Sequence, residues 1–263
     1  MPTIDKSSTI LQCVVSYGPR VRLAHLQQLT NIPKPTLHRL LHTMIEHGLI
    51  RQDDTGIYSV GSELFRLAHD VYNQFHIPVE ARQIMIDLQH EAKETIHLSL
   101  FRGGQLVYAE KLEAPHPFQM VSRVGKLQPL HSSAIGKAVL ALLPEPEAAQ
   151  LLARSLKRMT EFTIVDPRTL LTSLAAVRIQ GFAVDDEEDE AGLRAIGCAI
   201  CDAQGRPTGG LSIVAPSFQM SLTQAYAYAP LLVEAGRRIA EVIAQCEPDG
   251  PSADASVRVN DTG

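Results

Sequence analysis

The sequence predicts an α+β protein with two domains. The chain has 263 residues, a length that suggests two domains. Residues 20–60 hold two short helical patterns followed by two short strand patterns, and residues 79–245 mix helices with strands joined by tight turns. Helices and hairpin-linked strands in this order favour an α+β sheet domain over a regular βαβ fold.

The segment of residues 20–51 has the pattern of a helix-turn-helix. Three leucines recur at helical spacing ahead of a break at residues 30–33: Leu23, Leu26 and Leu29. A second helix is expected from about Pro35, because proline is tolerated in a first helical turn, to about Gly48, which is well placed to end it. Its buried stripe is expected to hold Leu37, Leu40, Leu41, Met44 and Ile45. The second helix of such a motif places its N-terminal residues against base edges in the major groove.

The outer face of this second helix is small-polar and basic. Many helical hairpins with such a face are only packing units, so the hairpin alone leaves packing and DNA binding open. Apolar-rich runs at residues 49–51 and 57–60 flank a turn at residues 52–56, and a hairpin in this place is what a winged helix-turn-helix requires. The two acidic residues at the turn argue mildly against a grip on phosphate there. The candidate DNA contacts are Arg22, Lys34, Pro35, Thr36, His38, Arg39, His42 and Arg51.

The formal net charge of −5 is unevenly distributed along the chain. Through residue 75 there are seven basic and six acidic residues, so this part carries about +1 and the remainder about −6. Residues 20–51 hold five of those basic residues and one acidic residue, Glu46. DNA affinity would therefore come from a local patch with moderate salt dependence, and a strongly basic protein that slides on DNA is disfavoured.

Targeting and cysteine patterns are those of an ordinary intracellular protein. No apolar run reaches membrane-spanning length and the first residues lack the apolar core of a signal peptide, so no membrane partner and a cytoplasmic location are expected. Cys198 and Cys201 have the C-x-x-C spacing, but side chains three apart on a strand face opposite ways and no second pair stands at zinc-site spacing. Reduced core thiols, with no metal and no cofactor, are the favoured interpretation.

The remaining elements divide the chain near Pro78. We expect a winged helix-turn-helix domain at residues 1–62, a linker helix at 63–77, a sheet domain at 78–246 and a disordered tail at 247–263. In the sheet domain the expected strands are residues 95–101, 106–112, 118–124, 182–185, 195–201 and 210–214. The expected helices are residues 79–93, 133–143, 145–154, 167–180 and 222–245. The apolar faces of residues 64–71 and of helix 79–93 are expected to make contacts between subunits.

Two segments of the second domain suggest a ligand site. His131, Ser132 or Ser133 can cap the helix that follows, which leaves the N–H groups of Ala134 and Ile135 directed outward as an anion site. Capping alone explains the serines but not the cluster of small residues around them. The acidic run of residues 185–190 directly follows an apolar strand, so Asp185 is a candidate ligand group while the other carboxylates are expected to face water.

Two other classes of function were weighed. An enzyme would need a nucleophile with its base, and the chain has neither a G-x-S-x-G motif nor a metal-ligand spacing. His131 beside Ser132 is not a dyad, because neighbouring residues seldom face each other. A pure adaptor would keep the helices but would need no pocket of small residues. An enzyme is disfavoured, and an adaptor stays open.

Four segments together resemble one known family. They read PKPTLHRLLHTMIEHGLI, RVGKLQPLHSSAIGKAVLALL, GFAVDDEEDEAGLRAIGCAI and GGLSIVAP, and they resemble the IclR family of bacterial transcriptional regulators over about residues 7–245. The resemblance implies a winged helix-turn-helix, a linker helix and a C-terminal GAF-like domain that binds a small effector. It also implies dimers, often paired into tetramers, on palindromic double-stranded operators.

Carried over residue by residue, the family's effector pocket falls on Ser133, Ala134, Ile135, Asp185, Ala195, Ile196, Ser212 and Val214. Two positions depart from the commoner pattern. Ala195 stands where many members have Cys, and Val214 stands where a second Ser is frequent. The resemblance therefore implies a less polar pocket, which disfavours a very small oxo-acid such as glyoxylate and favours a larger or partly aromatic carboxylate.

Overall fold

The computed structural model describes residues 2–18, 21–74, 77–115, 120, 122–153 and 156–246. The chain divides into two compact units, residues 1–76 and 77–263. The tail expected at residues 247–263 lies outside the described residues. Within the described part, no helix has both the length and the apolar character needed to cross a membrane.

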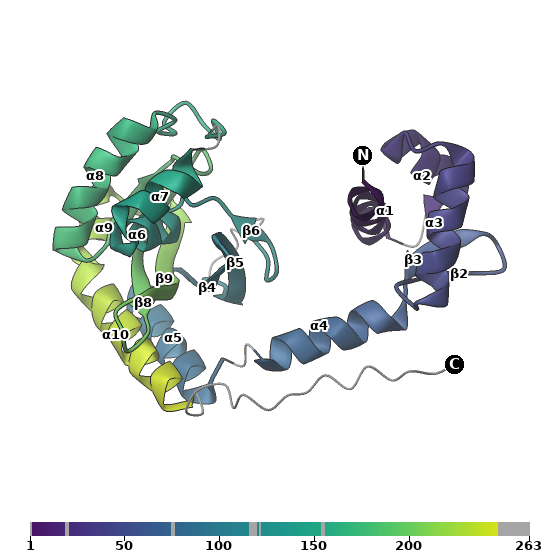
Figure 1. The fold of residues 1–263 in the computed structure, drawn as a ribbon. Helices are drawn as coiled ribbons and strands as arrows, with labels where there is room; N and C mark the ends of the chain where they lie inside the picture. The colour runs from purple at the N-terminus through teal and green to yellow at the C-terminus, as the bar shows by residue number, and fades with distance from the viewer. Residues whose placement is uncertain are drawn as a thin grey trace. The chain divides into compact units, whose positions relative to one another are not determined.

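The first unit is a winged helix-turn-helix (Figure 1), as the sequence predicts. Its elements are α1 (Thr3–Tyr17), β1 (Val21–Arg22), α2 (Leu23–Thr30), α3 (Lys34–Glu46), β2 (Ile50–Gln52), β3 (Ile57–Val60) and α4 (Ser62–Gln74). The strands pair antiparallel in the order β1-β3-β2, so the wing is a hairpin with one extra strand. The sequence analysis did not anticipate α1 or β1.

The helix-turn-helix is determined by the residues that end α2 and start α3 and by one apolar cluster. α2 ends at Asn31, which has a left-handed φ of 52°, and α3 starts after Pro33. Leu26, Leu37 and Leu41 are almost fully buried in the core of the unit. Ile45, expected on the same stripe, is 37% exposed. It lies about 80° around the helix from Leu37, at the edge of the stripe, because each helical residue advances by about 100°.

The second unit is a six-stranded antiparallel sheet with helices on both faces (Figure 1). Its strands are β4 (Thr95–Arg102), β5 (Gln105–Leu112), β6 (Leu127–Gln128), β7 (Ala183–Asp186), β8 (Leu193–Cys201) and β9 (Pro207–Pro216), in the order β6-β5-β4-β9-β8-β7. Its helices are α5 (Val79–Ala92), α6 (Ala134–Leu142), α7 (Glu145–Leu152), α8 (Pro167–Gln180), α9 (Leu222–Ala227) and α10 (Ala229–Cys246).

Alternation along the central strands separates the two faces of this sheet. One face is apolar and packs with α5 and α10, through residues such as Ile96, Ile196 and Ile213. The other face carries small and polar residues and packs against α6. Most apolar residues of α5 are buried in this core, while Val79 at its start is 74% exposed, so the subunit contact expected of this helix stays a prediction.

Two expected elements differ in the structure. Residues 118, 119 and 121 of the strand expected at 118–124 lie outside the described residues, and its described residues form no strand. A turn in which the Lys126 N–H donates to the Arg123 carbonyl precedes the short β6 instead. The helix expected at 222–245 is two helices, α9 and α10, separated at Tyr228. Pro230 explains the break, since it has no N–H to donate and its ring clashes with the preceding turn.

Candidate functional site

The candidate DNA-binding face belongs to the first unit. On α3 the side chains of Lys34, Pro35, His38, Arg39 and His42 are exposed, and Thr36 is half-buried. Arg22 and Arg51 are exposed on β1 and β2. His42 Nδ1 lies 3.4 Å from Glu46 Oε1, and Arg51 Nε donates to Ser59 Oγ at 2.9 Å. No described acidic side chain pairs with Lys34 or Arg39, so both cations are available to a ligand.

The acidic tip of the wing has a structural role. Asp53 Oδ1 accepts hydrogen bonds from the Thr55 and Ile57 N–H groups, at 3.0 and 2.9 Å. These bonds, that from Ile57 first, hold the pKa of Asp53 below its ordinary value. Asp53 therefore shapes the turn and does not bind phosphate.

The second candidate site is a cavity between α6 and the sheet in the second unit. Its volume is about 40 Å³. The lining residues are His97, Tyr108, Met120, Ser122, Gln128, Ala134, Asp185, Asp189, Glu190, Leu193, Ala195, Ser212 and Val214. Five of the eight residues predicted for the effector pocket are among them: Ala134, Asp185, Ala195, Ser212 and Val214.

The side chains of the other three predicted residues lie elsewhere. Ser133 caps α6, because its Oγ accepts from the Gly136 N–H at 3.1 Å and donates to the Pro129 carbonyl. Ile135 is buried against Gly210, and Ile196 lies in the core shared with α5 and α10. No described residue accepts a hydrogen bond from the N–H of Ala134 or Ile135, so the start of α6 keeps two free donors, and Ala134 lines the cavity.

His97 is a cavity residue that the sequence analysis missed. Its Nε2 lies 2.9 Å from Ser122 Oγ, while its Nδ1 has no partner among the described residues and neither has Ser212 Oγ. Burial, with Lys111 nearby, lowers the pKa of His97 to about 3, so the ring is neutral. The available signal was alternation, since His97 stands between Ile96 and Leu98 on a strand whose apolar residues face the other way.

Part of the acidic run is folded inward, contrary to the expectation that all but Asp185 face water. Glu188 is buried and Asp189 is half-buried, whereas Glu190 is exposed as expected. Asp185 Oδ1 accepts from the N–H groups of Glu188 and Asp189, at 2.8 and 3.2 Å. Glu188 is buried and forms an ion pair with Lys137 of α6. Ser132 Oγ donates to Asp189 Oδ1 at 2.8 Å. The physical reason for the correction is that donors from distant parts of the chain, which the sequence alone does not locate, meet these carboxylates.

Burial decides the charge of the cavity. It raises the pKa of Asp185 to about 8, an effect that the nearby Lys137 opposes. It also raises the pKa of Asp189, where the hydrogen bond from Ser132 opposes it. At neutral pH, Asp185 is therefore mostly protonated and offers a hydrogen bond instead of a negative charge.

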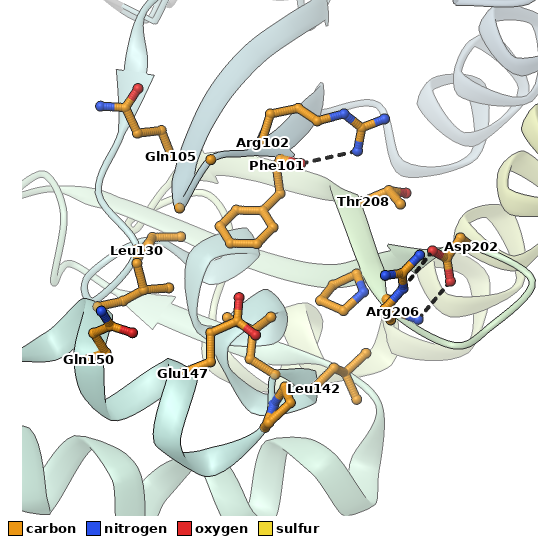
Figure 2. A pocket seen from close by; sticks show the side chains of 16 residues that line it. Phe101, Arg102, Gln105, Leu130, Leu142, Glu147, Gln150, Asp202, Arg206 and Thr208 are labelled. Atoms are coloured by element: carbon orange, nitrogen blue, oxygen red, sulfur yellow. Dashed lines mark hydrogen bonds and ion pairs between the residues drawn. The ribbon is translucent and has the colours of Figure 1, made fainter. Parts of the chain in front are cut away.

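A larger cleft lies at one end of the sheet, where the β4–β5 turn and the β8–β9 turn both line it (Figure 2). Its volume is about 870 Å³. Figure 2 shows the Phe101 ring and the Glu147 carboxylate pointing into it, with Arg206 bonded to Asp202 at its edge. Its charged side chains are mostly exposed, and none is buried without a partner among the described residues. Size favours this cleft, but the enclosed donors and acceptors of the smaller cavity favour the latter as the ligand site.

Cys198 and Cys201 are free thiols without a reactive setting. Cys198 is fully surrounded, and burial raises its pKa to about 12. Cys201 is half-buried, and burial raises its pKa as well. Both shifts disfavour the thiolate that redox and metal chemistry require.

Asp185 makes the stability of the fold depend on pH. Between pH 3.8, where the carboxyl ordinarily titrates, and about pH 8, the unfolded chain releases the proton that the folded protein keeps. Rising pH therefore favours unfolding through this window. Asp185→Asn removes this penalty, and its amide oxygen still accepts from Glu188 and Asp189. We expect the variant to exceed wild type by roughly 1–4 kcal/mol near pH 7 and to match it near pH 4, in urea unfolding.

Asp166→Asn is the matched control for this measurement. Hydrogen bonds from Thr169 hold the pKa of the exposed Asp166 below its ordinary value, so the ionised form of Asp166 stabilises the fold at neutral pH. Asp166→Asn should therefore gain no stability relative to wild type as the pH rises. Equal pH profiles for Asp185→Asn and wild type would show that Asp185 is ionised in the folded protein.

Comparison with known protein families identifies both units. A family model described as "Bacterial transcriptional regulator IclR C-terminal" matches residues 69–241, and one described as "IclR helix-turn-helix domain" matches residues 3–54. The transcriptional regulator KdgR of Escherichia coli (strain K12) is 35% identical over 221 residues, which are 83% of this chain and 84% of KdgR. The transcriptional repressor IclR of the same organism is 27% identical over 241 residues, 90% of this chain and 88% of that protein.

Solved structures show the same fold. The crystal structure of Thermotoga maritima IclR is 30% identical, with a TM-score of 0.72 over 92% of this chain and 98% of that one. An IclR homolog from Microbacterium hydrocarbonoxydans, complexed with 4-hydroxybenzoate, is 21% identical, with a TM-score of 0.74 over 94% of this chain and 100% of that one. The relatives are transcriptional regulators and not enzymes. The chain belongs to the IclR family of bacterial transcriptional regulators.

Proposed function

We propose that this regulator binds a palindromic operator as a homodimer or a pair of dimers, in the cytoplasm, and that a small carboxylate sets its operator affinity. Residues 1–62 bind the DNA, residues 63–77 link the domains and residues 78–246 bind the effector. The observation that carries the carboxylate assignment is the start of α6, which has two free N–H groups and whose first residue, Ala134, lines the cavity. A helix N-terminus of this kind stabilises a negative charge.

The protonated Asp185 supports the same assignment. A carboxylate ligand beside three ionised carboxyl groups would be repelled, and the lining includes Asp185, Asp189 and Glu190. Burial keeps Asp185 mostly neutral at pH 7, so it can donate to a carboxylate oxygen or to another acceptor on the effector. Ala195 and Val214 make one wall apolar, which favours a larger or partly aromatic acid. The homolog crystallised with 4-hydroxybenzoate supports this by analogy of fold.

The small volume of the cavity couples binding to conformation. An organic acid is larger than about 40 Å³, so it enters only as the lining segments move apart. An effector shifts DNA binding by its differential affinity for the two arrangements of the protein. We place the communication in α4, the covalent path between the units, whose described side chains include the exposed Phe65 and Leu67.

Arg39→Ala tests the recognition helix. Arg39 is an exposed cation on α3 without an acidic partner among the described residues, and a bidentate contact to guanine is worth about 1–3 kcal/mol. We expect operator affinity to fall by about 5- to 150-fold at constant salt, measured by gel shift on an operator selected from random-sequence DNA. Arg168→Ala, an exposed arginine of α8, is the control. Unchanged binding by Arg39→Ala would remove this residue from the interface.

Sedimentation tests the assembly. We expect at least a dimer at micromolar concentration, because one winged helix reads one half-site and two are needed on a palindrome. Phe65, 76% exposed on α4, is a candidate contact, so Phe65→Ser should weaken the dimer. Asp70→Ser, which lies about 140° around the same helix, should not. A wild-type monomer, with or without operator DNA, would contradict the proposal.

Ala195→Leu tests the effector site. Ala195 lines the cavity, and the added carbon atoms fill a volume of about 40 Å³ while the cap at Ser133 stays intact. Wild-type protein is screened by thermal shift against a panel of carboxylates, and the acid with the largest effect is then titrated into the operator complex. We expect Ala195→Leu to bind the operator like wild type and to lose at least about tenfold in its response to that acid. A full response in the variant would place the ligand elsewhere, and an absence of DNA binding in wild type would favour an adaptor.

A further inference from the structure

Three residues form a row across the sheet beneath the start of α6. Gly197 on β8 pairs with Ser212 on β9, and Ser212 pairs with His97 on β4. Register partners in neighbouring strands project from the same face, and strands lie about 4.8 Å apart. A Cβ at Gly197 would lie 2.7 Å from the Ile135 nitrogen, so α6 begins directly above Gly197. Ser212 thus lies about 5 Å, and His97 about 10 Å, to one side of the anion site at α6.

The two polar members of this row are left without partners. His97 is 2% exposed and Ser212 is 1% exposed, yet His97 Nδ1 and Ser212 Oγ accept or donate no hydrogen bond among the described residues. A buried polar atom in this state costs about 1–3 kcal/mol. Both residues line the same cavity and are direct neighbours. Such a pair calls for a ligand or an ordered water that satisfies both.

The chemistry of the pair selects a neutral oxygen. The His97 ring is neutral, because burial lowers its pKa to about 3, and its Nε2 is occupied by Ser122 Oγ. One donor or acceptor at Nδ1 and one hydroxyl at Ser212 match a hydroxyl or oxo group. A second carboxylate would meet no cation in this row, since Lys111 directs its Nζ to the carbonyls of Met120 and Ser122.

We propose that His97, together with Ser212, reads an oxygen substituent on the effector that lies three or more bonds from its carboxylate. This inference rests on the proposed carboxylate site at α6. His97 is thereby a specificity-determining residue. An oxygen placed between Ser212 and His97 lies about 5–10 Å from the anion site, whereas a substituent on the carbon next to the carboxylate remains above Gly197.

Three probes of equal chain length separate these positions: pentanoate, 2-oxopentanoate and 4-oxopentanoate. Their affinities for the full-length protein are measured by titration calorimetry and by their effect on operator binding. We expect 4-oxopentanoate to bind about three- to tenfold more tightly than pentanoate, and 2-oxopentanoate to show no such gain.

Two matched variants separate recognition of the effector through Nδ1 of His97 from the structural contact of its Nε2 with Ser122. The amide of Asn takes the place of Nδ1, whereas the amide of Gln takes the place of Nε2. His97→Asn should therefore keep the preference for 4-oxopentanoate, and His97→Gln, which keeps the contact with Ser122, should lose it. Ser212→Ala should also lose it. Arg168→Ala on α8, outside the cavity, is the control and should keep both the wild-type affinity for pentanoate and the preference for 4-oxopentanoate. The folding of every variant is checked by circular dichroism.

The outcomes distinguish the two proposals. If pentanoate binds but wild type shows no preference for 4-oxopentanoate, a water or a structural role explains His97 and this inference is wrong, while the carboxylate site stands. A preference that survives in His97→Gln also overturns it. If none of the three acids binds wild-type protein, the carboxylate site itself fails and the inference falls with it.

Discussion

The second domain depends on the close approach of one helix to one strand. A Cβ at Gly197 would lie 2.7 Å from the Ile135 nitrogen and 2.9 Å from the Ala134 carbonyl carbon, distances at which backbone has to move. Gly136 plays the same part on the other side, since its Cβ would lie 2.5 Å from the Leu130 carbonyl oxygen. Gly197 thus lets the first turn of α6 lie on the sheet, and Gly136 lets the segment that enters the helix pass close to it.

The buried ion pair between Lys137 and Glu188 extends this constraint to the acidic loop. Removing two charges from water is costly, and the pair offsets that cost only while both partners stay together. Thr163 adds a hydrogen bond to the Glu188 carbonyl at 2.7 Å, and Ser132 holds Asp189 from the residue before the helix cap. The loop that carries Asp185 is therefore tied to α6, so a ligand that displaces either segment displaces both.

Sequence reasoning succeeded where the signal is local. The period of Leu37, Leu40 and Leu41 and the breaks at Pro33 and Gly48 placed α3 correctly, and tight turns placed the hairpin of β4 and β5. α1 was missed because its N-cap residue, Pro2, makes no side-chain hydrogen bond, so the sequence lacks the usual capping signal at the start of this helix.

The candidate cavity was only partly predictable for the same reason. Asp185 and the small residues after Ser133 stood out locally, and both border the site. His97 stands out only because it pairs with Ser212, and these two residues belong to neighbouring strands that are far apart in the sequence. The inward fold of the acidic run likewise depends on Lys137, whose distance along the chain hides the pairing. Register and long-range ion pairs are properties of the fold, and single-sequence periodicity does not contain them.

The unsatisfied atoms give the cavity a thermodynamic role in switching. His97 Nδ1 and Ser212 Oγ each carry a desolvation cost of about 1–3 kcal/mol in the closed cavity. A ligand that bonds both removes this cost and at the same time requires the lining to open, so its binding free energy differs between the two arrangements. Coupling free energies in allosteric proteins are about 1–3 kcal/mol, which is a 5- to 150-fold change in affinity. One satisfied pair of buried atoms is therefore sufficient in magnitude to drive the change in operator affinity that a regulator needs.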